Sequence, residues 1–310
     1  MSQSIYDVVI IGGGPAGLTA GLYTSRAKLK TLLLERMIMG GQVMTTTRVE
    51  NYPGFPGGID GPDLMVRFQE HCQEFGLEVE YGEVEGLLDR GENKVVIVDG
   101  KEIHTRAVII TTGAEPRKLE VPGEKEFTGR GVSYCATCDG AFFREVPVAI
   151  VGGGDTAVEE ALFLTRFASK VYLIHRRDQL RATTILQERL RHNEKVEILW
   201  HQTVQRVEGD ASGLKAVELT DSRTGEKSPL EVEGLFVAIG VTPKAHFLAE
   251  ILQLDDEGYI LTDAECRTSM PGVFAAGDVR KKILKQIATA VGDGAVAAIM
   301  AEKYMDELTE

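Results

Sequence analysis

The chain has 310 residues, of which 43% are hydrophobic and 26% charged, and its formal net charge is −13. This length favours two domains with a large buried core. The negative charge argues against binding to nucleic acid or to an anionic membrane surface, and no apolar run approaches the roughly 18 residues of a membrane span. The start of the chain shows no secretory pattern and four cysteines are too few for a disulfide scaffold, so a cytoplasmic protein is expected.

A glycine-rich turn follows the first predicted strand, residues 7–11, and opens a predicted helix over residues 16–28. Its G-x-G-x-x-G spacing allows a tight bend, a close approach of backbone to a pyrophosphate, and close packing of helix on strand. The next strand, residues 31–34, ends at an acid that can accept hydrogen bonds from a ribose. A dinucleotide site is therefore predicted at Gly12, Gly14, Pro15, Ala16, Gly17 and Glu35.

The segment that follows reads as loops at residues 40–42 and 50–54, a helix at residues 62–75 and several strands. A buried strand at residues 107–113 ends in Thr-Gly, and Gly113 suits a close approach of backbone to a cofactor.

The strand–turn–helix pattern repeats later in the chain. A strand at residues 148–151 leads into a G-x-G-x-x-A turn, a helix at residues 158–167 and a strand at residues 170–174. Glu35 lies 23 residues after Gly12, and His175 lies 23 residues after Gly152. A carboxylate at this position would repel a 2′-phosphate, whereas arginines bind one.

The first turn is therefore predicted to hold FAD or NAD and the second NADPH. The predicted NADPH residues are Gly152, Gly154, Asp155, Thr156, His175, Arg176, Arg177 and Arg181. A solvated basic face remains the alternative for the arginines, because Arg189 and Arg191 continue the basic run.

The remainder predicts short strands to residue 240 and a crossover back to the first domain after Pro243. Further strands are expected at residues 259–260 and 273–278, and a helix from residue 283 to about 308.

Cys135 and Cys138 form a CxxC motif followed directly by Asp139. Half a zinc site would need two further ligands, and Cys72 and Cys266 are isolated. A structural disulfide is disfavoured by the expected compartment, so a redox dithiol is the favoured interpretation. Asp139 can protonate the thiolate that disulfide reduction releases, although a simple turn residue remains the alternative.

These motifs together resemble the bacterial-type, low-molecular-weight thioredoxin reductases over essentially the whole chain. The matching stretches are residues 12–17, 40–42, 50–54, 135–140, 152–157, 175–177 and 277–278. The Cys-Ala-Thr-Cys-Asp run is the most specific, and the other motifs are shared with flavoprotein relatives.

The resemblance implies an α/β fold with two Rossmann-like domains, the second inserted into the first. It implies an FAD domain at residues 1–115 and 246–310, and an NADPH domain carrying the CxxC at residues 116–245. It further implies a homodimer, thioredoxin as substrate and a domain rotation during turnover. By this resemblance Cys138 lies near the flavin, Cys135 attacks thioredoxin and Asp139 is the acid–base residue. The implied additional FAD contacts are Gly41, Gln42, Asn51, Asp278, Gln286, Ile287 and Ala288.

Two positions depart from the family pattern. Lys285 stands where the family usually has Arg, which puts one bidentate contact in doubt. Lys244-Ala245 replaces the frequent Asn-Thr at the expected crossover. The alternative functions are a flavin-dependent reductase or oxidase of another disulfide or dithiol, and a non-catalytic nucleotide-sensing or metal-binding module.

Overall fold

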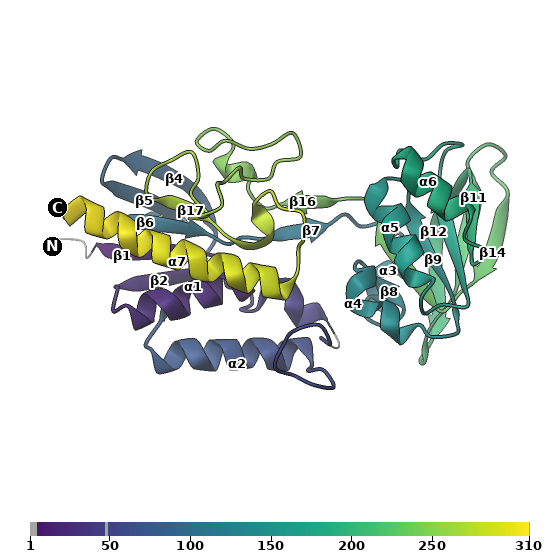
Figure 1. Ribbon diagram of the computed structural model, residues 1–310, viewed down its shortest axis with the longest axis horizontal. Coiled ribbons are helices and arrows are strands. Elements are labelled where there is room, and N and C mark those ends of the chain that lie inside the picture. The colour runs from purple at the N-terminus through teal and green to yellow at the C-terminus, as the bar shows by residue number, and fades with distance from the viewer. Residues whose placement is uncertain (1–4, 47–48, 310) are drawn as a thin grey trace. The chain divides into compact units, whose positions relative to one another are not determined.

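A computed structural model describes residues 5–46 and 49–309 (Figure 1). The chain divides into two compact units, one made of residues 1–115 and 242–310 and the other of residues 116–241. Each unit is built on a parallel sheet with helices, which confirms the predicted α/β, Rossmann-like fold class. The chain returns to the first unit after residue 241, four residues before the boundary expected at residue 245.

The first unit has a seven-stranded sheet in the order β3-β2-β1-β6-β5-β4, with β17 also paired to β6. The strands β1, β2, β3, β6 and β17 run parallel, whereas β4 and β5 form antiparallel pairs. Their bounds are β1 Tyr6–Ile11, β2 Thr31–Glu35, β3 Glu78–Tyr81, β4 Val84–Arg90, β5 Asn93–Val98, β6 Lys101–Ile110 and β17 Val273–Ala275. The continuous apolar runs of the central strands are buried, as expected where both faces of a parallel sheet are covered.

Three long helices belong to this unit: α1 Pro15–Arg26, α2 Gly61–Glu74 and α7 Ile287–Thr309 (Figure 1). The prediction that the last helix starts at residue 283 is wrong by four residues. Gln286 caps the helix instead, because its N–H donates to Thr289 Oγ1 (3.1 Å) and its carbonyl accepts the first helical bond from Ala290. The unit also contains the 3₁₀ turns η1 Gly41–Thr45, η3 His246–Leu248 and η4 Gly277–Val279.

The second unit has a five-stranded parallel sheet in the order β11-β10-β9-β15-β8 and a separate antiparallel sheet in the order β12-β13-β14. The bounds of its strands are β8 Val132–Ser133, β9 Pro147–Gly152, β10 Lys170–His175, β11 Val196–Trp200, β12 Gln202–Asp210, β13 Gly213–Asp221, β14 Lys227–Glu231 and β15 Gly234–Ala238. Its helical segments are α3 Glu124–Phe127, α4 Ala136–Asp139, η2 Gly140–Phe142, α5 Asp155–Leu164 and α6 Thr184–Arg191. The helix predicted at residues 158–167 therefore begins three residues earlier, directly after Gly154, and ends three residues earlier.

Each unit has its own hydrophobic core, because every cluster of buried apolar side chains among the described residues lies within one unit. The two chain crossings pair as short strands, β7 Ala114–Pro116 and β16 Val241–Pro243. The strand predicted at residues 259–260 is reduced to isolated bridges at Ile260.

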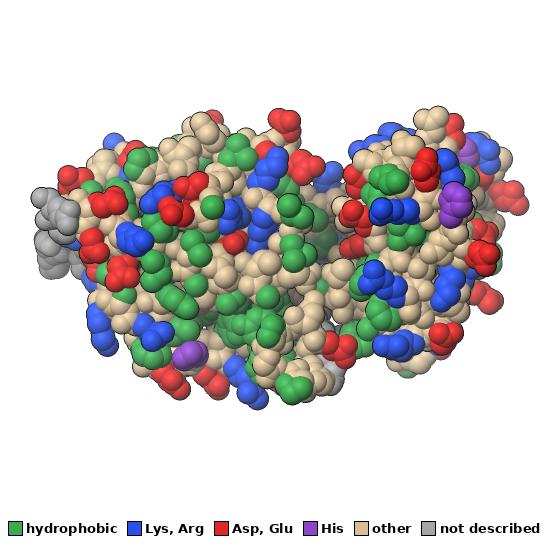
Figure 2. All heavy atoms as spheres, in the orientation of Figure 1, with side chains coloured by type: hydrophobic (Ala, Val, Ile, Leu, Met, Phe, Trp, Pro, Cys, Tyr) green, Lys and Arg blue, Asp and Glu red, His purple; other side chains and the backbone are tan. Residues whose placement is uncertain are grey.

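The charged surface of the molecule is mixed. On the face shown in Figure 2, acidic and basic side chains are interspersed over both units.

None of the helices formed by residues 5–46 and 49–309 is both long and apolar enough to cross a bilayer.

Candidate active site and nucleotide sites

The two motif cysteines are joined in a disulfide, with Cα atoms 5.3 Å apart. The one-turn helix α4 starts directly after Cys135, whose carbonyl accepts hydrogen bonds from the N–H groups of Cys138 (3.2 Å) and Asp139 (3.1 Å). Ala136 is fully buried in the core that also contains α5, which anchors the turn. The CxxC spacing thus places both sulfurs on one helical turn that is fixed to the sheet domain.

Asp139 is held at the end of this turn by a hydrogen bond that the motif did not predict. Ser133 Oγ donates to Asp139 Oδ2 at 2.6 Å, and Ser133 itself is buried. Burial raises the pKa of the Asp139 carboxyl, and the hydrogen bond from Ser133 acts in the opposite direction. A single serine two residues before the motif carries no periodic or motif signal, so sequence reasoning had no means to find it.

A second acid, Glu160 of α5, lies behind the cysteine turn. Burial raises its pKa to about 7, a hydrogen bond from the Ala136 N–H lowers it, and the neighbouring Glu159 raises it. Ala136 is the first residue of α4, so this carboxyl accepts one of the N–H groups that a helix start leaves without a partner. The sequence analysis missed Glu160, although an acidic pair on the helix after the glycine turn was visible.

The first glycine turn has the shape of a phosphate cradle. A Cβ on Gly12 would lie 2.5 Å from the carbonyl oxygen of Thr111, and a Cβ on Gly17 would collide with the carbonyl of Gly12. A Cβ on Gly14, by contrast, would meet no atom within 4 Å. The open space thus lies where the first amides of α1 are exposed for an anion.

Glu35 ends β2 beside this cradle. Its Oε2 accepts a hydrogen bond from the Gly13 N–H (2.8 Å) and its Oε1 one from the Met37 N–H (2.9 Å). Pro15 and Ala16 form the start of α1, and a Cβ on Gly41 would lie 3.3 Å from the Cα of Gly14.

Residues from the end of the chain meet the same turn. A Cβ on Gly277 would lie 2.9 Å from the Cβ of Ala16, which places the Gly277-Asp278 turn against α1. Asn51 Nδ2 donates to Gln286 Oε1 (2.9 Å), although the two are 235 residues apart. Ile287 and Ala288 form the first turn of α7, Gln42 lies in η1, and Gly113 follows β6 in an open position with φ of 72°.

Asp278 has a buried carboxylate oxygen without a hydrogen-bond partner among the described residues. Its Oδ1 is buried and makes no hydrogen bond among the described residues, and Lys282 Nζ lies 3.8 Å away, too far to donate. Burial raises the pKa of Asp278, and the charges of Lys282 and Lys285 lower it. A buried polar atom without a partner is costly, so this oxygen fits a donor supplied by a bound nucleotide. Lys285, which departs from the family pattern, stacks its ammonium over Tyr259 at 4.2 Å from the ring centroid.

The second glycine turn repeats the cradle, with Ala157 in the place that Gly17 has in the first turn. A Cβ on Gly154 would meet no atom within 4 Å, while a Cβ on Gly152 would meet the methyl group of Ala157. Asp155 Oδ1, next to Thr156 at the start of α5, accepts a hydrogen bond from the Thr183 N–H (2.6 Å).

The predicted basic residues at the end of β10 and just beyond it comprise one buried and three exposed side chains. His175 is 8% exposed, and its Nδ1 and Nε2 lie 2.7 Å and 2.8 Å from the carbonyl oxygens of Gly152 and Gln179. Its ring therefore ties the turn together. The guanidinium groups of Arg176, Arg177 and Arg181 are exposed and make no hydrogen bond or ion pair within the described part of the chain. They remain available to an anion.

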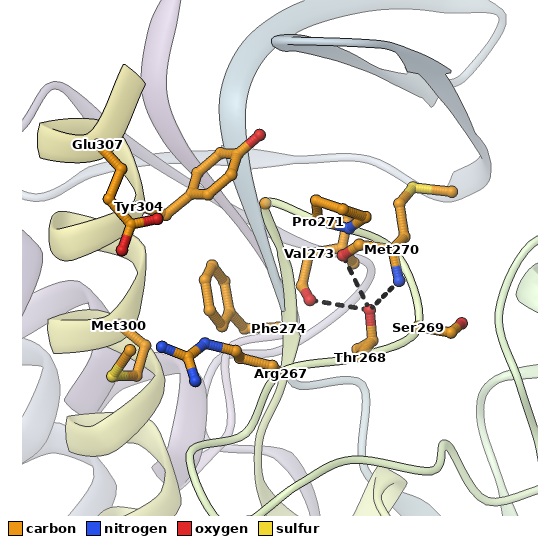
Figure 3. Close-up of a pocket in the computed structure, with 11 residues that line it drawn as sticks. Arg267, Thr268, Ser269, Met270, Pro271, Val273, Phe274, Met300, Tyr304 and Glu307 are labelled. Carbon is orange, nitrogen blue, oxygen red and sulfur yellow. Dashed lines mark hydrogen bonds between the residues drawn. The ribbon is translucent and has the colours of Figure 1, made fainter. Parts of the chain in front are cut away.

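A pocket of about 300 Å³ in the first unit lies apart from all these residues (Figure 3). The loop of residues 267–274 forms one wall and Met300, Tyr304 and Glu307 of α7 form the other. None of the predicted site residues lines it. The candidate sites are therefore defined by the two cradles and the disulfide, and not by this pocket.

The family model described as pyridine nucleotide-disulphide oxidoreductase matches residues 6–294. The chain belongs to this family. It is 51% identical over 308 residues to the thioredoxin reductase of Listeria innocua, covering 99% of this chain and 96% of the relative. It is also 51% identical to the thioredoxin reductase of Bacillus subtilis, covering 99% and 97%. The crystal structure of thioredoxin reductase from Streptococcus pyogenes is 45% identical, with a TM-score of 0.95 and coverage of 99% and 100%.

Family membership confirms the resemblance stated from the motifs and makes this chain an oxidoreductase. The Cys135–Cys138 disulfide agrees with the description of this family as disulphide oxidoreductases.

Proposed function

We propose that this protein is a thioredoxin reductase that uses NADPH and FAD to reduce the disulfide of thioredoxin. The observation that carries the proposal is the Cys135–Cys138 disulfide on a one-turn helix, inside a unit with a basic dinucleotide turn. The full-length identity of about 51% to thioredoxin reductases supports the same substrate.

The first unit fits FAD. Gly14 leaves room for a pyrophosphate at the start of α1, Glu35 offers a carboxylate to a ribose, and Asp278 has a buried oxygen in need of a donor. A bound flavin would supply the capacity to accept a hydride and to deliver two electrons to a disulfide. The further contacts proposed from the resemblance are Gly41, Gln42, Asn51, Gly113, Gln286, Ile287 and Ala288.

The second unit fits NADPH. Gly154 and the first turn of α5 form the pyrophosphate cradle, and the exposed guanidinium groups of Arg176, Arg177 and Arg181 can bind a 2′-phosphate. Because the His175 ring lies between the carbonyl oxygens of Gly152 and Gln179, we assign to it the positioning of this turn.

The chemistry of the cysteine pair follows from thiol–disulfide exchange. Once the pair is reduced, the Cys135 thiolate attacks one sulfur of the thioredoxin disulfide. A mixed disulfide forms as the thioredoxin S–S bond breaks, and the other thioredoxin sulfur leaves as a first thiolate. The Cys138 thiolate then attacks the Cys135 sulfur, which restores the Cys135–Cys138 bond and releases a thioredoxin thiolate. Asp139 gives a proton to a released thioredoxin thiolate and regains one from the Cys138 thiol as that thiol becomes the attacking thiolate. Two electrons and two protons pass from the pair to thioredoxin.

We further propose a homodimer in the cytoplasm. Apolar side chains on three helices of the first unit are exposed to solvent, as a partner subunit would require: Tyr23, Val66, Val296 and Ile299. A dithiol that must be kept reduced by NADPH suits a reducing compartment.

The test is the Cys138→Ser variant of the purified, flavin-loaded protein. NADPH should still bleach the flavin absorbance, whereas thioredoxin reduction should be abolished, because the pair can no longer form its disulfide. Cys72→Ala is the matched control, since Cys72 is a buried thiol that donates to the carbonyl of Leu18 in the other unit. Normal turnover of Cys138→Ser would exclude the proposed relay.

A further inference from the structure

Ser133 occupies the junction between the sheet and the cysteine turn. It ends β8, pairs with Phe236 of β15 and is 5% exposed. Its hydroxyl accepts a hydrogen bond from the Cys135 N–H (3.1 Å) and donates one to Asp139 Oδ2 (2.6 Å). The carbonyl oxygen of Cys135 lies 3.4 Å from the same hydroxyl.

A hydroxyl has one proton to donate and two lone pairs with which to accept. The Ser133 hydroxyl can therefore form a hydrogen bond with Asp139 whether that carboxyl is ionised or protonated. When Asp139 is ionised, the Ser133 proton points to the carboxylate and one lone pair binds the Cys135 N–H. When Asp139 is protonated, its own O–H can donate to the second lone pair of Ser133. The Ser133 proton can then turn to the Cys135 carbonyl. No buried polar group loses its partner in either state, and no backbone atom has to move.

We infer that Ser133 is a positioning residue of the disulfide exchange, which holds the Asp139 carboxyl against the Cys135 segment in both protonation states. The inference rests on the proposed function, in which Asp139 moves a proton to and from a thiolate. A hydroxyl that rotates about one bond lets a buried acid change its charge without a rearrangement of the turn.

The other titratable groups around the turn have hydrogen-bond partners other than Asp139. Glu160 of α5 accepts from the Ala136 N–H, with Glu159 beside it on the same helix. The hydroxyl of Tyr134 donates to Glu124 Oε1 (2.9 Å). In the described part of the chain, Ser133 is the side chain that donates to Asp139.

The experiment compares Ser133→Thr with Ser133→Val in the flavin-loaded enzyme. These two side chains have the same shape and suit a strand, and only threonine keeps the hydroxyl. The protonation of Asp139 is followed by carbon NMR of aspartate-labelled protein, with Asp139→Asn identifying the signal. Thioredoxin reduction is measured on the same samples.

Ser133→Val should raise the pH at which Asp139 is half protonated, because a bond that favours the carboxylate is lost. It should slow thioredoxin reduction roughly tenfold, while Ser133→Thr stays near the wild type. In an Asp139→Asn background the valine change should have no additional effect. An unshifted Asp139 titration, or an equal loss of rate in the Asn background, would overturn the inference. A wild type that fails to reduce thioredoxin would defeat the proposed function instead, and the titration would still decide the role of Ser133.

Discussion

Two residues at equivalent places in the repeat determine whether each site is expected to bind a free ribose hydroxyl or a 2′-phosphate. β2 ends at Glu35 and β10 ends at His175, which is followed by two exposed arginines. A carboxylate accepts hydrogen bonds from a ribose, whereas guanidinium groups bind a phosphate with paired, charge-assisted bonds.

The arginines give the first prediction at this scale. Replacing Arg176 and Arg177 together by alanine should raise the KM for NADPH more than tenfold, because each charge-assisted contact contributes about 1.5–3 kcal/mol. The KM for NADH, which has no 2′-phosphate, should change little. Steady-state kinetics with both nucleotides measure the difference, and Arg189→Ala, on the exposed side of α6, is the control. Equal changes for the two nucleotides would rule out the phosphate assignment.

Glu160 gives a prediction about pH and stability. Its pKa is raised from 4.5 to about 7, so the folded protein favours the neutral acid. The stability contributed by this group is fully present below pH 4.5 and is lost as the pH rises through about 7, a loss of roughly 3 kcal/mol. Glu160→Gln keeps an oxygen for the Ala136 N–H but cannot ionise. It should therefore be more stable than the wild type at pH 8 and similar at pH 4.

Urea unfolding at the two pH values measures this effect. Glu159→Gln, on the exposed neighbouring residue, removes only the small contribution of its charge to the Glu160 pKa and should show a much smaller gain at pH 8. The measured quantity is the difference in the free energy of unfolding between Glu160→Gln and the wild type. If this difference is the same at pH 8 and at pH 4, the Glu160 carboxyl is not held in its neutral form.

At the scale of elements, different glycines of one turn serve packing and ligand binding. Gly17 is needed because α1 crosses the carbonyl of Gly12 without space for a methyl group, whereas Gly14 faces open space. The second unit accepts Ala157 at the position equivalent to Gly17, so the close approach is tighter in the first unit.

Two alanine substitutions distinguish these roles. Gly17→Ala should lower the Tm of the apoprotein and prevent flavin retention, because the methyl group forces helix and strand apart. Gly14→Ala should leave the Tm of the apoprotein unchanged but weaken FAD binding at least tenfold, since the methyl group enters the pyrophosphate space. Calorimetry of the apoprotein and titration with FAD measure both. A Gly14→Ala variant that binds FAD normally would show that the pyrophosphate lies elsewhere.

At the scale of the whole molecule, the second unit is one continuous segment and the first unit is not. Residues 116–241 contain two complete hydrophobic clusters, and the first unit needs β17 and α7 from the end of the chain to complete its sheet and cover it. Domains with their own core can fold alone.

We therefore expect the isolated fragment 116–241 to fold and to bind NADPH with nearly the affinity of the full chain. The fragment 1–115 should not fold, whereas 1–115 joined by a short flexible linker to 242–310 should retain FAD. Circular dichroism, calorimetric titration with NADPH and flavin absorbance are the measurements. Failure of 116–241 to bind NADPH, although folded, would place part of the nucleotide site outside this unit.

The features that depend on local spacing could be predicted from the amino-acid sequence. The strand–turn–helix repeats, the acid or arginines at the strand ends and the CxxC pair all follow from a few neighbouring residues. The glycine positions are dictated by backbone geometry that side chains cannot adopt or would obstruct. These patterns sufficed for the fold class and the redox interpretation of Cys135 and Cys138.

Which polar groups share one environment became known from the folded chain. Glu160 reaches Ala136 and Asn51 reaches Gln286 because packing of the chain brings their elements together, and Ser133 reaches Asp139 because the chain turns back between them. The folded chain also showed that the His175 ring lies between two carbonyl oxygens and that α7 begins at Ile287. The physical reason is that burial and the pairing of polar groups are properties of the packed chain, and no local pattern in the sequence records them.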